Sequence, residues 1–261
     1  MNCRIMICAL LSLSAAGPCA AQIAGEFSPP QSNCCLLGAA ERLAQQLQDW
    51  NQLGRYHQAN QQLLAGPRDP GRVVFMGDSI TDGWRLDQSF PGKPYVNRGI
   101  GGQTTAQMLV RFYPDVIALQ PAAVVILAGT NDIARNNGMQ TLEMIQHNIM
   151  AMTQLARVHG IKVVLCALTP INDYKRRSEQ QGGGPLVQSR ARPPADIIKL
   201  NAWLKSYAAT TGAAYADYHG ATADKDGYLV DADTGDGLHP NAAGYAKMAP
   251  VVATAIAQVL R

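Results

Sequence analysis

Residues 71–80 read GRVVFMGDSI, and this stretch decides the fold that we expect. Its part Arg72–Met76 is apolar after the first residue and does not alternate with polar residues, which is typical of a strand buried on both faces. Gly77 permits a tight turn directly after the strand. The polar residues that follow the glycine then open a helix. The stretch therefore predicts a strand, turn and helix with chemically reactive side chains at the turn.

Further apolar runs of strand length follow, and longer segments with helical periodicity separate them. The predicted strands are Arg72–Met76, Tyr95–Gly99, Ala123–Ala128, Lys162–Leu168 and Ala213–Asp217, and the predicted helices include Met139–His159, Ala195–Thr211 and Asn241–Val259. Strands that are apolar throughout and alternate with helices indicate a parallel sheet covered on both faces. We therefore expect an α/β fold with five parallel strands and right-handed crossovers.

The N-terminus carries a different signal. Residues 1–21 contain one arginine, a short apolar run and then small residues, as in a signal peptide cleaved after Ala21. The apolar run is shorter than the ~20 residues of a spanning helix, so we expect a secreted or periplasmic protein without a stable membrane span. A lipoprotein would use Cys19, although Pro18 before it fits poorly.

The remaining chain divides into two parts. Residues 22–71 are a polar segment with a helical stretch over Cys35–Leu64 and a linker, and 72–261 form the main domain. Cys34 and Cys35 are adjacent and could pair with another chain or with nothing, whereas Cys166 lies in an apolar run and is expected to be an inert buried thiol. A net charge of +3 is too small to indicate nucleic acid or an anionic membrane as the main partner.

The ends of the predicted strands carry the candidate chemistry, because ligands of an open parallel sheet bind beyond the carboxyl ends of its strands. Ser79 follows the first strand and could be a nucleophile or simply a helix cap. His239 is its best candidate base, with His219 as a rival. Asp236 lies three residues before His239 and could orient the ring, or could only form a turn.

Attack by the serine would put a negative charge on the carbonyl oxygen of the substrate, which would need hydrogen-bond donors. The N–H groups of Ser79 and Gly102 and the side-chain amide of Asn131 could converge on it, which predicts an oxyanion hole. The plain alternatives are a turn or cap for Asn131 and a phosphate cradle for the glycines. The cradle is disfavoured, because residues 99–105 lack both the dinucleotide-binding glycine spacing and the Gly-Lys-Ser/Thr ending of a P-loop.

The four blocks GDSI (77–80), Gly102, GTND (129–132) and DGLHP (236–240) together resemble the SGNH (GDSL-type) hydrolases in order and spacing, over about residues 72–258. The resemblance implies a flavodoxin-like three-layer α/β/α sandwich. It also implies a Ser79 nucleophile, a His239 base with Asp236 as its partner, and Ser79, Gly102 and Asn131 as the oxyanion hole. Ile80 replaces the family's leucine, and the neighbouring Gly101 leaves the choice of glycine open. Within the family, the chain is similar to lysophospholipase-like and acetylhydrolase-like secreted esterases.

The implied function is hydrolysis of a carboxylic ester, with a small-molecule, lipid or carbohydrate ester as substrate and with no metal or organic cofactor. A carbohydrate O-acetyl esterase or an O-acyltransferase would use the same residues, and a non-catalytic binding module is a further alternative. The motifs specify neither the acyl length nor the oligomeric state.

Three other features have a structural and a functional interpretation. The aspartates between 224 and 236 do not fit the EF-hand template and are expected to form an acidic surface loop. Arg85, Arg98 and Arg111 could meet an anionic substrate, but surface salt bridges are the expected role. The basic stretch within 173–194 is expected to be a long exposed loop, with a flap over the acyl pocket as a hypothesis.

Overall fold

The computed structural model describes residues 49–175 and 184–261. The predicted signal peptide, its cleavage site and Cys34 and Cys35 lie outside the described residues. Of the helical stretch predicted over Cys35–Leu64, the described part contains turns followed by helix α2 (His57–Ala65). Among the described helices, none combines the length and the apolar character needed to cross a membrane.

Five parallel strands form a sheet in the order β2-β1-β3-β4-β5, which confirms the predicted α/β fold. The strands are β1 (Val73–Gly77), β2 (Tyr95–Gly99), β3 (Ala123–Leu127), β4 (Lys162–Cys166) and β5 (Ala214–Ala216). The helices after α2 are α3 (Ser79–Asp82), α4 (Leu86–Ser89), α5 (Thr105–Asp115), α6 (Thr130–Ile133), α7 (Leu142–Val158), α8 (Pro194–Thr211), α9 (Tyr218–Thr222) and α10 (Ala242–Val259), with short 3₁₀ helices at Ile117–Leu119 and Asp231–Asp233.

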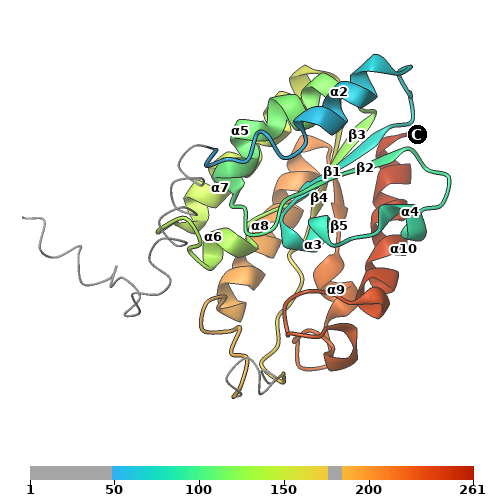
Figure 1. Cartoon of the computed structure of the whole chain (residues 1–261). Helices are drawn as coiled ribbons and strands as arrows, with labels where there is room; N and C mark the ends of the chain where they lie inside the picture. Colours follow the sequence, from blue (N-terminus) through green and yellow to red (C-terminus); the bar gives the residue numbers. More distant parts are fainter. Residues whose placement is uncertain (1–48, 176–183) are drawn as a thin grey trace, which may run out of the picture. The chain divides into compact units, whose positions relative to one another are not determined.

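Helices cover both faces of the sheet (Figure 1). Helices α7 and α8 pack on β4 and on each other, and α5 packs against α7. Helix α10 packs on β3, β4 and β5 from the opposite face. The sheet is therefore the middle layer of three, as expected for strands that are apolar on both faces.

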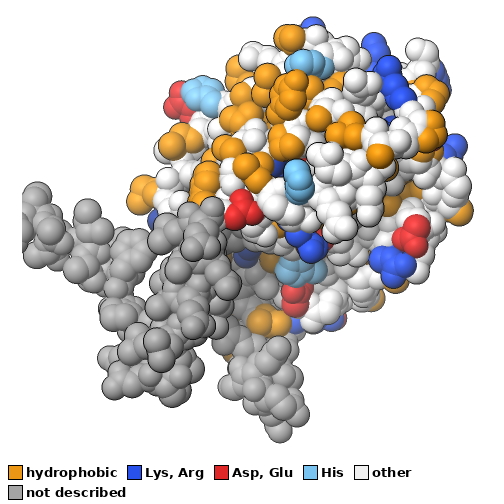
Figure 2. Space-filling model, turned by 45° about the horizontal axis from the view of Figure 1, so that its top comes forward, with side chains coloured by type: hydrophobic (Ala, Val, Ile, Leu, Met, Phe, Trp, Pro, Cys, Tyr) orange, Lys and Arg blue, Asp and Glu red, His pale blue; other side chains and the backbone are white. Residues whose placement is uncertain are grey.

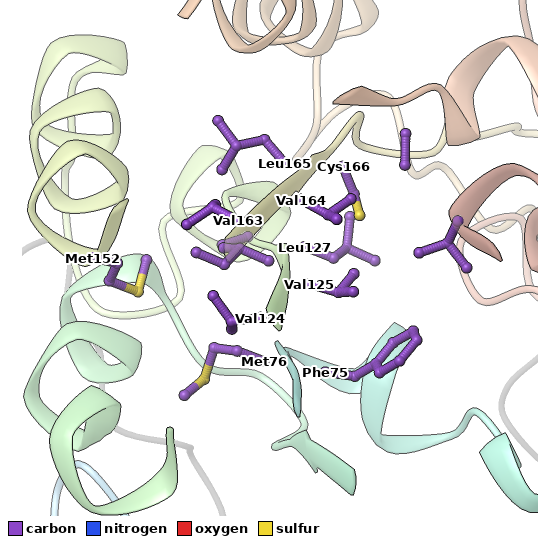
Figure 3. Packing of buried hydrophobic residues seen from close by; sticks show 14 of the residues in the cluster. Phe75, Met76, Val124, Val125, Leu127, Met152, Val163, Val164, Leu165 and Cys166 are labelled. Carbon is purple, nitrogen blue, oxygen red and sulfur yellow. The ribbon is translucent and has the colours of Figure 1, made fainter. Parts of the chain in front are cut away.

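The hydrophobic core lies on both sides of the central strands (Figure 3). Met76 and Met152 lie on the side of α7, and Phe75 lies on the other side. Phe75 packs edge to face on Trp84, which in turn stacks on Tyr245 of α10 with ring centroids 5.1 Å apart. Trp84 is almost fully buried, so these aromatic rings pack into the core on the α10 side of the sheet.

Three strands end earlier than predicted, and the first of them, β3, ends at Leu127 and not at Ala128. The fourth strand was expected to reach Leu168 but ends at Cys166. The backbone N–H of Leu168 instead donates to Oδ1 of Asn201, and its carbonyl accepts from Nδ2 of the same side chain. The fifth strand is three residues long, since it pairs only with Val164–Cys166.

Arg98 and Arg111 are buried, so the expected surface salt bridges are wrong for both. Arg98 donates to Oδ1 of Asn60 and lies over the ring of Tyr56. Arg111 pairs with Asp115 at 3.0 Å inside the protein. The expectation failed because both arginines find partners that are remote in sequence or on the same buried helix face. Arg85, in contrast, forms an exposed pair with Asp87.

Apolar side chains also remain on the surface. Leu64 of α2 and Val110 and Tyr113 of α5 are all more than two-fifths exposed. Figure 2 shows hydrophobic side chains gathered over the upper part of its view, with charged side chains between them. Exposed apolar residues are ordinary on soluble domains when polar residues separate them.

The register of the central strands brings their ends to one level. Gly77 at the end of β1 pairs with Gly99 at the end of β2 and with Leu127 at the end of β3. The segments that begin at Asp78, Ile100 and Ala128 therefore leave the sheet side by side. Since β2 and β3 lie on opposite sides of β1, this edge is also the place where the chain order reverses, where ligands of such sheets bind.

Candidate active site

Ser79 is the first residue of the short helix α3, directly after β1. Gly77 makes this turn possible, because a Cβ there would lie 2.1 Å from Oγ1 of Thr81 and 2.9 Å from the carbonyl oxygen of Leu127. Asp78 caps the helix, with Oδ1 accepting from the N–H of Ile80 at 2.9 Å. Ser79 is thus held at a helix N-terminus, where backbone N–H groups have no partner within the helix.

His239 and Asp236 come from the loop between β5 and α10. The hydroxyl of Thr234 organises this loop, because it donates to the carbonyl of His239 and accepts from the N–H of Gly237. Gly237 has a φ of +83°, and a Cβ there would lie 2.3 Å from the carbonyl oxygen of Asn172. The glycine therefore lets the loop pass against the segment that follows β4.

The structure joins Ser79, His239 and Asp236 in a series of two hydrogen-bond contacts. Nε2 of His239 lies 2.9 Å from Oγ of Ser79, across 160 residues of sequence, and Nδ1 lies 2.6 Å from Oδ2 of Asp236. Because the carboxylate accepts a hydrogen bond from the N–H of Nδ1, the proton of the neutral ring lies on Nδ1, and Nε2 is left as an acceptor for the serine hydroxyl. The rival His219 lies half-buried on α9.

Asp236 is built to stay ionised. Burial raises its pKa, but hydrogen bonds from the His239 ring and from the backbone N–H groups of His239 and Leu238 outweigh this and lower the pKa overall. Oδ1 receives both backbone bonds, at 2.8 Å from His239 and 2.9 Å from Leu238, while Oδ2 receives the ring. The two oxygens thus have separate tasks, and the carboxylate cannot rotate without losing backbone bonds.

Gly102 and Asn131 follow neighbouring strands at the same edge of the sheet, and Asn131 bonds the residue after Gly102. Nδ2 of Asn131 donates to the carbonyl oxygen of Gln103 at 3.1 Å. Asp132, the next residue, accepts from the N–H and the hydroxyl of Thr105. The loop after β2 is thereby fixed to α6 after β3. A Cβ on Gly101 would lie 3.8 Å from Cβ of Ser79, so this loop passes beside the serine.

Four residues that the sequence analysis did not assign to the site support it. Gln103 accepts from Nε of Arg111 at 2.5 Å, and Arg111 also donates to the carbonyl of Gly77, just before the serine turn. Arg192 donates to Oδ1 of Asn131 and to Gln188, and Gln188 donates to the carbonyl of Asp236. The sequence offered no signal for the roles of Gln188 and Arg192, because both lie outside helices and strands and their partners Asp236 and Asn131 are remote in sequence.

The loop expected over 173–194 is therefore not wholly exposed. Its described residues 173–175 and 184–194 include Gln188 and Arg192, which are half-buried against the site. Asp173 accepts from the backbone N–H groups of Gln188 and Ser189 and so anchors the loop near the end of β4. The flap hypothesis concerns residues that extend beyond the described part.

Within the described residues, no group of three histidine, cysteine or acidic side chains is placed to hold a metal ion. The aspartates of the acidic loop have structural partners instead. Asp224 accepts from the backbone N–H groups of Asp226 and Tyr228. Asp233 is buried, unlike the surface position expected for it, and pairs with Lys247 at 2.6 Å. Cys166 is buried as predicted, and burial raises the pKa of its thiol to about 12.

Asp78 is a fully buried carboxyl beside the serine. Burial raises its pKa to about 6, although the hydrogen bond from Ile80 and the nearby His239 act in the opposite direction. Its Oδ2 atom has no hydrogen-bond partner among the described residues. Between about pH 4 and pH 6 the folded state therefore binds more protons than the unfolded state, and stability falls as the pH rises through this window.

Asp78→Asn is expected to remove this pH dependence, because the amide does not titrate and its oxygen can still cap α3. The variant should gain roughly 1–3 kcal/mol of unfolding free energy relative to wild type on going from pH 4 to pH 7. Denaturant unfolding of both proteins at the two pH values measures this difference. A difference that stays constant with pH would contradict the prediction, and Asp226→Asn on the exposed loop is the control.

The fold and the comparison with known families define the class of protein, a parallel α/β hydrolase that acts on ester bonds. The sequence profile of the GDSL-like Lipase/Acylhydrolase family matches residues 75–247. The chain belongs to this family, as its four motifs predict.

Individual relatives agree with this assignment. The structure of a GDSL-like lipase from Bacteroides thetaiotaomicron is 33% identical, with a TM-score of 0.68, and the match covers 80% of this chain and 98% of that one. Platelet-activating factor acetylhydrolase IB subunit alpha2 of Rattus norvegicus is 30% identical over 198 residues, which are 72% of this chain and 77% of the relative.

Two further relatives are matched over a smaller share of their length. An uncharacterized lipoprotein of Bacillus subtilis, YqeF, is 35% identical over 118 residues, which are 38% of this chain and 49% of that protein. An acetylxylan esterase of Xylanibacter ruminicola is 27% identical over 230 residues, 74% of this chain and 44% of the relative. The chain thus spans about half the length of each of these two relatives.

Proposed function

We propose that this protein is a serine esterase that cleaves carboxylic esters with Ser79 as nucleophile, His239 as general base and Asp236 as its orienting partner. The observation that carries the proposal is the line of contacts from Oγ of Ser79 through the His239 ring to Oδ2 of Asp236, at 2.9 and 2.6 Å. The first distance is within the range in which a base can take a proton from a hydroxyl, and the second is a hydrogen bond by which Asp236 can orient the ring.

The first step would form an acyl-enzyme. His239 takes the Ser79 proton on Nε2 as Oγ attacks the carbonyl carbon of the ester. Asp236 stabilises the imidazolium that results, without being protonated itself. His239 then returns the proton to the oxygen of the leaving alcohol, and the acyl group remains on Ser79.

In the second step, water would take the place of the Ser79 hydroxyl as the attacking group, and Ser79 would be the leaving group. His239 takes a proton from a water molecule as that water attacks the acyl carbon, and then protonates Oγ of Ser79 as the carboxylic acid leaves. If another alcohol took the place of water, the same residues would perform acyl transfer. Which acceptor is used would depend on the groups around the site, and not on the three residues themselves.

The negative oxygen formed in each step would be held by the N–H groups of Ser79 and Gly102 and by Nδ2 of Asn131. The neighbouring Gly101 is a weaker candidate, because its N–H already donates to Oδ2 of Asp82 at 3.3 Å. Nδ2 of Asn131 carries two hydrogens, and one of them is directed at the carbonyl of Gln103. The other remains for the oxyanion.

Asn131→Ala is expected to lower kcat by about 100- to 1000-fold, because one donor to the oxyanion is lost. KM should change much less, since the donor acts mainly on the transition state. Steady-state kinetics on a soluble ester separates the two constants. Asn136→Ala is the matched control, because this exposed side chain donates to the carbonyl of Gly102 and bonds no other of the described residues. An equal loss in both variants would contradict the assignment of Asn131.

The substrate that we favour is an ester with a short acyl group. Two relatives are named for acetyl esters, one an acetylhydrolase and the other an acetylxylan esterase, although their alcohol halves differ in kind. This supports acetyl as the shared acyl group and leaves a lipid or a carbohydrate as the alcohol. A lysophospholipase would instead need room for a long acyl chain.

A p-nitrophenyl ester series from acetate to palmitate tests this proposal with the purified protein and Ser79→Ala. We expect Ser79-dependent hydrolysis that is fastest on acetate and falls with chain length. Hydrolysis that extends to palmitate would favour a lysophospholipase. No Ser79-dependent hydrolysis of any ester would overturn the esterase proposal in favour of an acyltransferase or a binding module, which labelling of Ser79 by a fluorophosphonate would then separate.

We also propose that the protein is exported and that its mature form begins at Gln22. The charged, apolar and small-residue regions of 1–21 support this, and so does the likeness to a bacterial lipoprotein. Mass spectrometry of the protein from the extracellular or periplasmic fraction is expected to find Gln22 as the first residue. A chain that begins at a lipid-modified Cys19 would contradict this cleavage site, and an intact Met1 would contradict export.

A further inference from the structure

Arg192 reaches the proposed oxyanion hole from a part of the chain that carries none of the family's motifs. Its Nη2 donates to Oδ1 of Asn131 at 3.2 Å, and its Nη1 donates to Oε1 of Gln188 at 3.3 Å. Arg192 is half-buried, and burial lowers the pKa of its guanidinium while Asp78 and Asp236 act in the opposite direction. An arginine stays protonated in such surroundings, so a positive charge lies beside Asn131.

The turn that carries Arg192 is held in place at several points. Asp173 accepts from the N–H groups of Gln188 and Ser189, and the backbone N–H of Arg192 donates to the carbonyl of Gln188. The side chain of Gln188 then uses both ends, since Nε2 donates to the carbonyl of Asp236 at 3.0 Å and Oε1 accepts from Arg192. A continuous row of hydrogen bonds thus joins the loop of the general base to the oxyanion side.

The contacts of Asn131 show what Arg192 can do there. A side-chain amide has an accepting end and a donating end, and a flip of the group exchanges them. Arg192 offers only donors, so it requires the oxygen of Asn131 on its side, and the carbonyl of Gln103 requires the nitrogen on the other. A flipped amide would turn its oxygen toward the developing oxyanion, where two negative atoms would repel each other.

We propose that Arg192 is a positioning residue that fixes the amide of Asn131 with its N–H groups toward the reacting carbonyl and polarises that amide by its charge. This role rests on the proposed function. It is distinct from substrate binding, in which the guanidinium would pair with an acidic group of the ester and act mainly on KM. The position of Arg192 on Oδ1 of Asn131 favours the first role.

Arg192→Gln is expected to lower kcat by about 10- to 100-fold, the effect of losing a charge-assisted hydrogen bond in the transition state, with KM changed less than about threefold. Arg192→Lys should recover part of the loss, because its ammonium can donate to Asn131 but not also to Gln188 in the same planar geometry. Arg190→Gln is the matched control, since Arg190 lies two residues earlier in the same turn and is exposed.

A double variant separates this role from a general loss of structure. If Arg192 acts through Asn131, Arg192→Gln added to Asn131→Ala should lower kcat by less than about threefold beyond Asn131→Ala alone. Independent effects would multiply, which would overturn the proposal, as would a rise in KM at unchanged kcat or a kcat of Arg192→Gln equal to that of wild type. Thermal unfolding of each variant shows that it is folded under the conditions of the assay.

The outcome also distinguishes the two proposals. Wild-type and Arg190→Gln proteins that hydrolyse p-nitrophenyl acetate, beside an inactive Ser79→Ala, establish the esterase before Arg192 is assessed. An active wild type with an unaffected Arg192→Gln variant would overturn only the role of Arg192. A wild type without Ser79-dependent hydrolysis would overturn the proposed function and this role together.

Discussion

Ser79→Ala is expected to lower kcat on any ester substrate by about 10⁵- to 10⁶-fold, because the nucleophile is lost and His239 has no hydroxyl to activate. The fold should not change, since the Ser79 hydroxyl contacts Nε2 of His239 at the surface of the site and supports no core packing. We therefore expect a melting temperature within about one or two degrees of wild type, as for a surface substitution.

Steady-state kinetics and thermal unfolding of the same preparation check this result. Ser206→Ala is the matched control, because Ser206 is an exposed serine of α8. A Ser79→Ala protein that keeps more than a small fraction of the wild-type kcat would exclude the serine as nucleophile. The attacking group would then have to be a water activated by His239, or another side chain at the edge of the sheet.

Asp236→Asn is expected to lower kcat by about 10⁴-fold, because it favours the tautomer of His239 that carries its proton on Nε2 and not on Nδ1. The two backbone N–H groups that bond Oδ1 would hold the oxygen of the asparagine in that place, so its NH₂ group would face Nδ1 of His239. Nδ1 would then have to accept, and Nε2 would carry the proton toward Ser79. A ring in that tautomer cannot take the serine proton.

The measurement combines kinetics with stability as a function of pH. Because hydrogen bonds lower the pKa of Asp236, its contribution to stability is present above the ordinary carboxyl pKa and is lost as the pH falls through the lowered value. The difference in melting temperature between wild type and Asp236→Asn should therefore narrow below about pH 4. Asp226→Asn on the exposed loop is the control. Wild-type kcat in Asp236→Asn would rule out Asp236 as the orienting partner.

The sequence by itself determined the sheet, most of the helices and the motifs of the site. Runs such as those that became β1 and β3 are apolar throughout, and this property is local, so it can be recognised without coordinates. Ser79, Gly102, Asn131 and His239 lie in segments that follow the strands. Such segments gather at the carboxyl edge of a parallel sheet whatever their distance in sequence, so the sequence could predict that these residues share one site. The family resemblance of these blocks named the chemistry before any contact was known.

Only the tertiary structure decided which side chains meet and which are enclosed. The sequence left His219 as a rival base, and the structure instead places His239 at 2.9 Å from Ser79. Gly101 and Gly102 were equivalent in sequence, and only the structure shows that the N–H of Gly101 donates to Asp82, which supports Gly102 as the proposed oxyanion donor.

The sequence also placed Arg98 and Arg111 at the surface and included Arg192 in an exposed loop. These predictions about the exposure of the three arginines were wrong for a physical reason. A charged side chain can be buried when its donors find carbonyl, amide or carboxylate partners, and those partners come from residues far away along the chain. Apolar periodicity and local motifs are properties of neighbouring residues, whereas the enclosure of a charge depends on the completed fold.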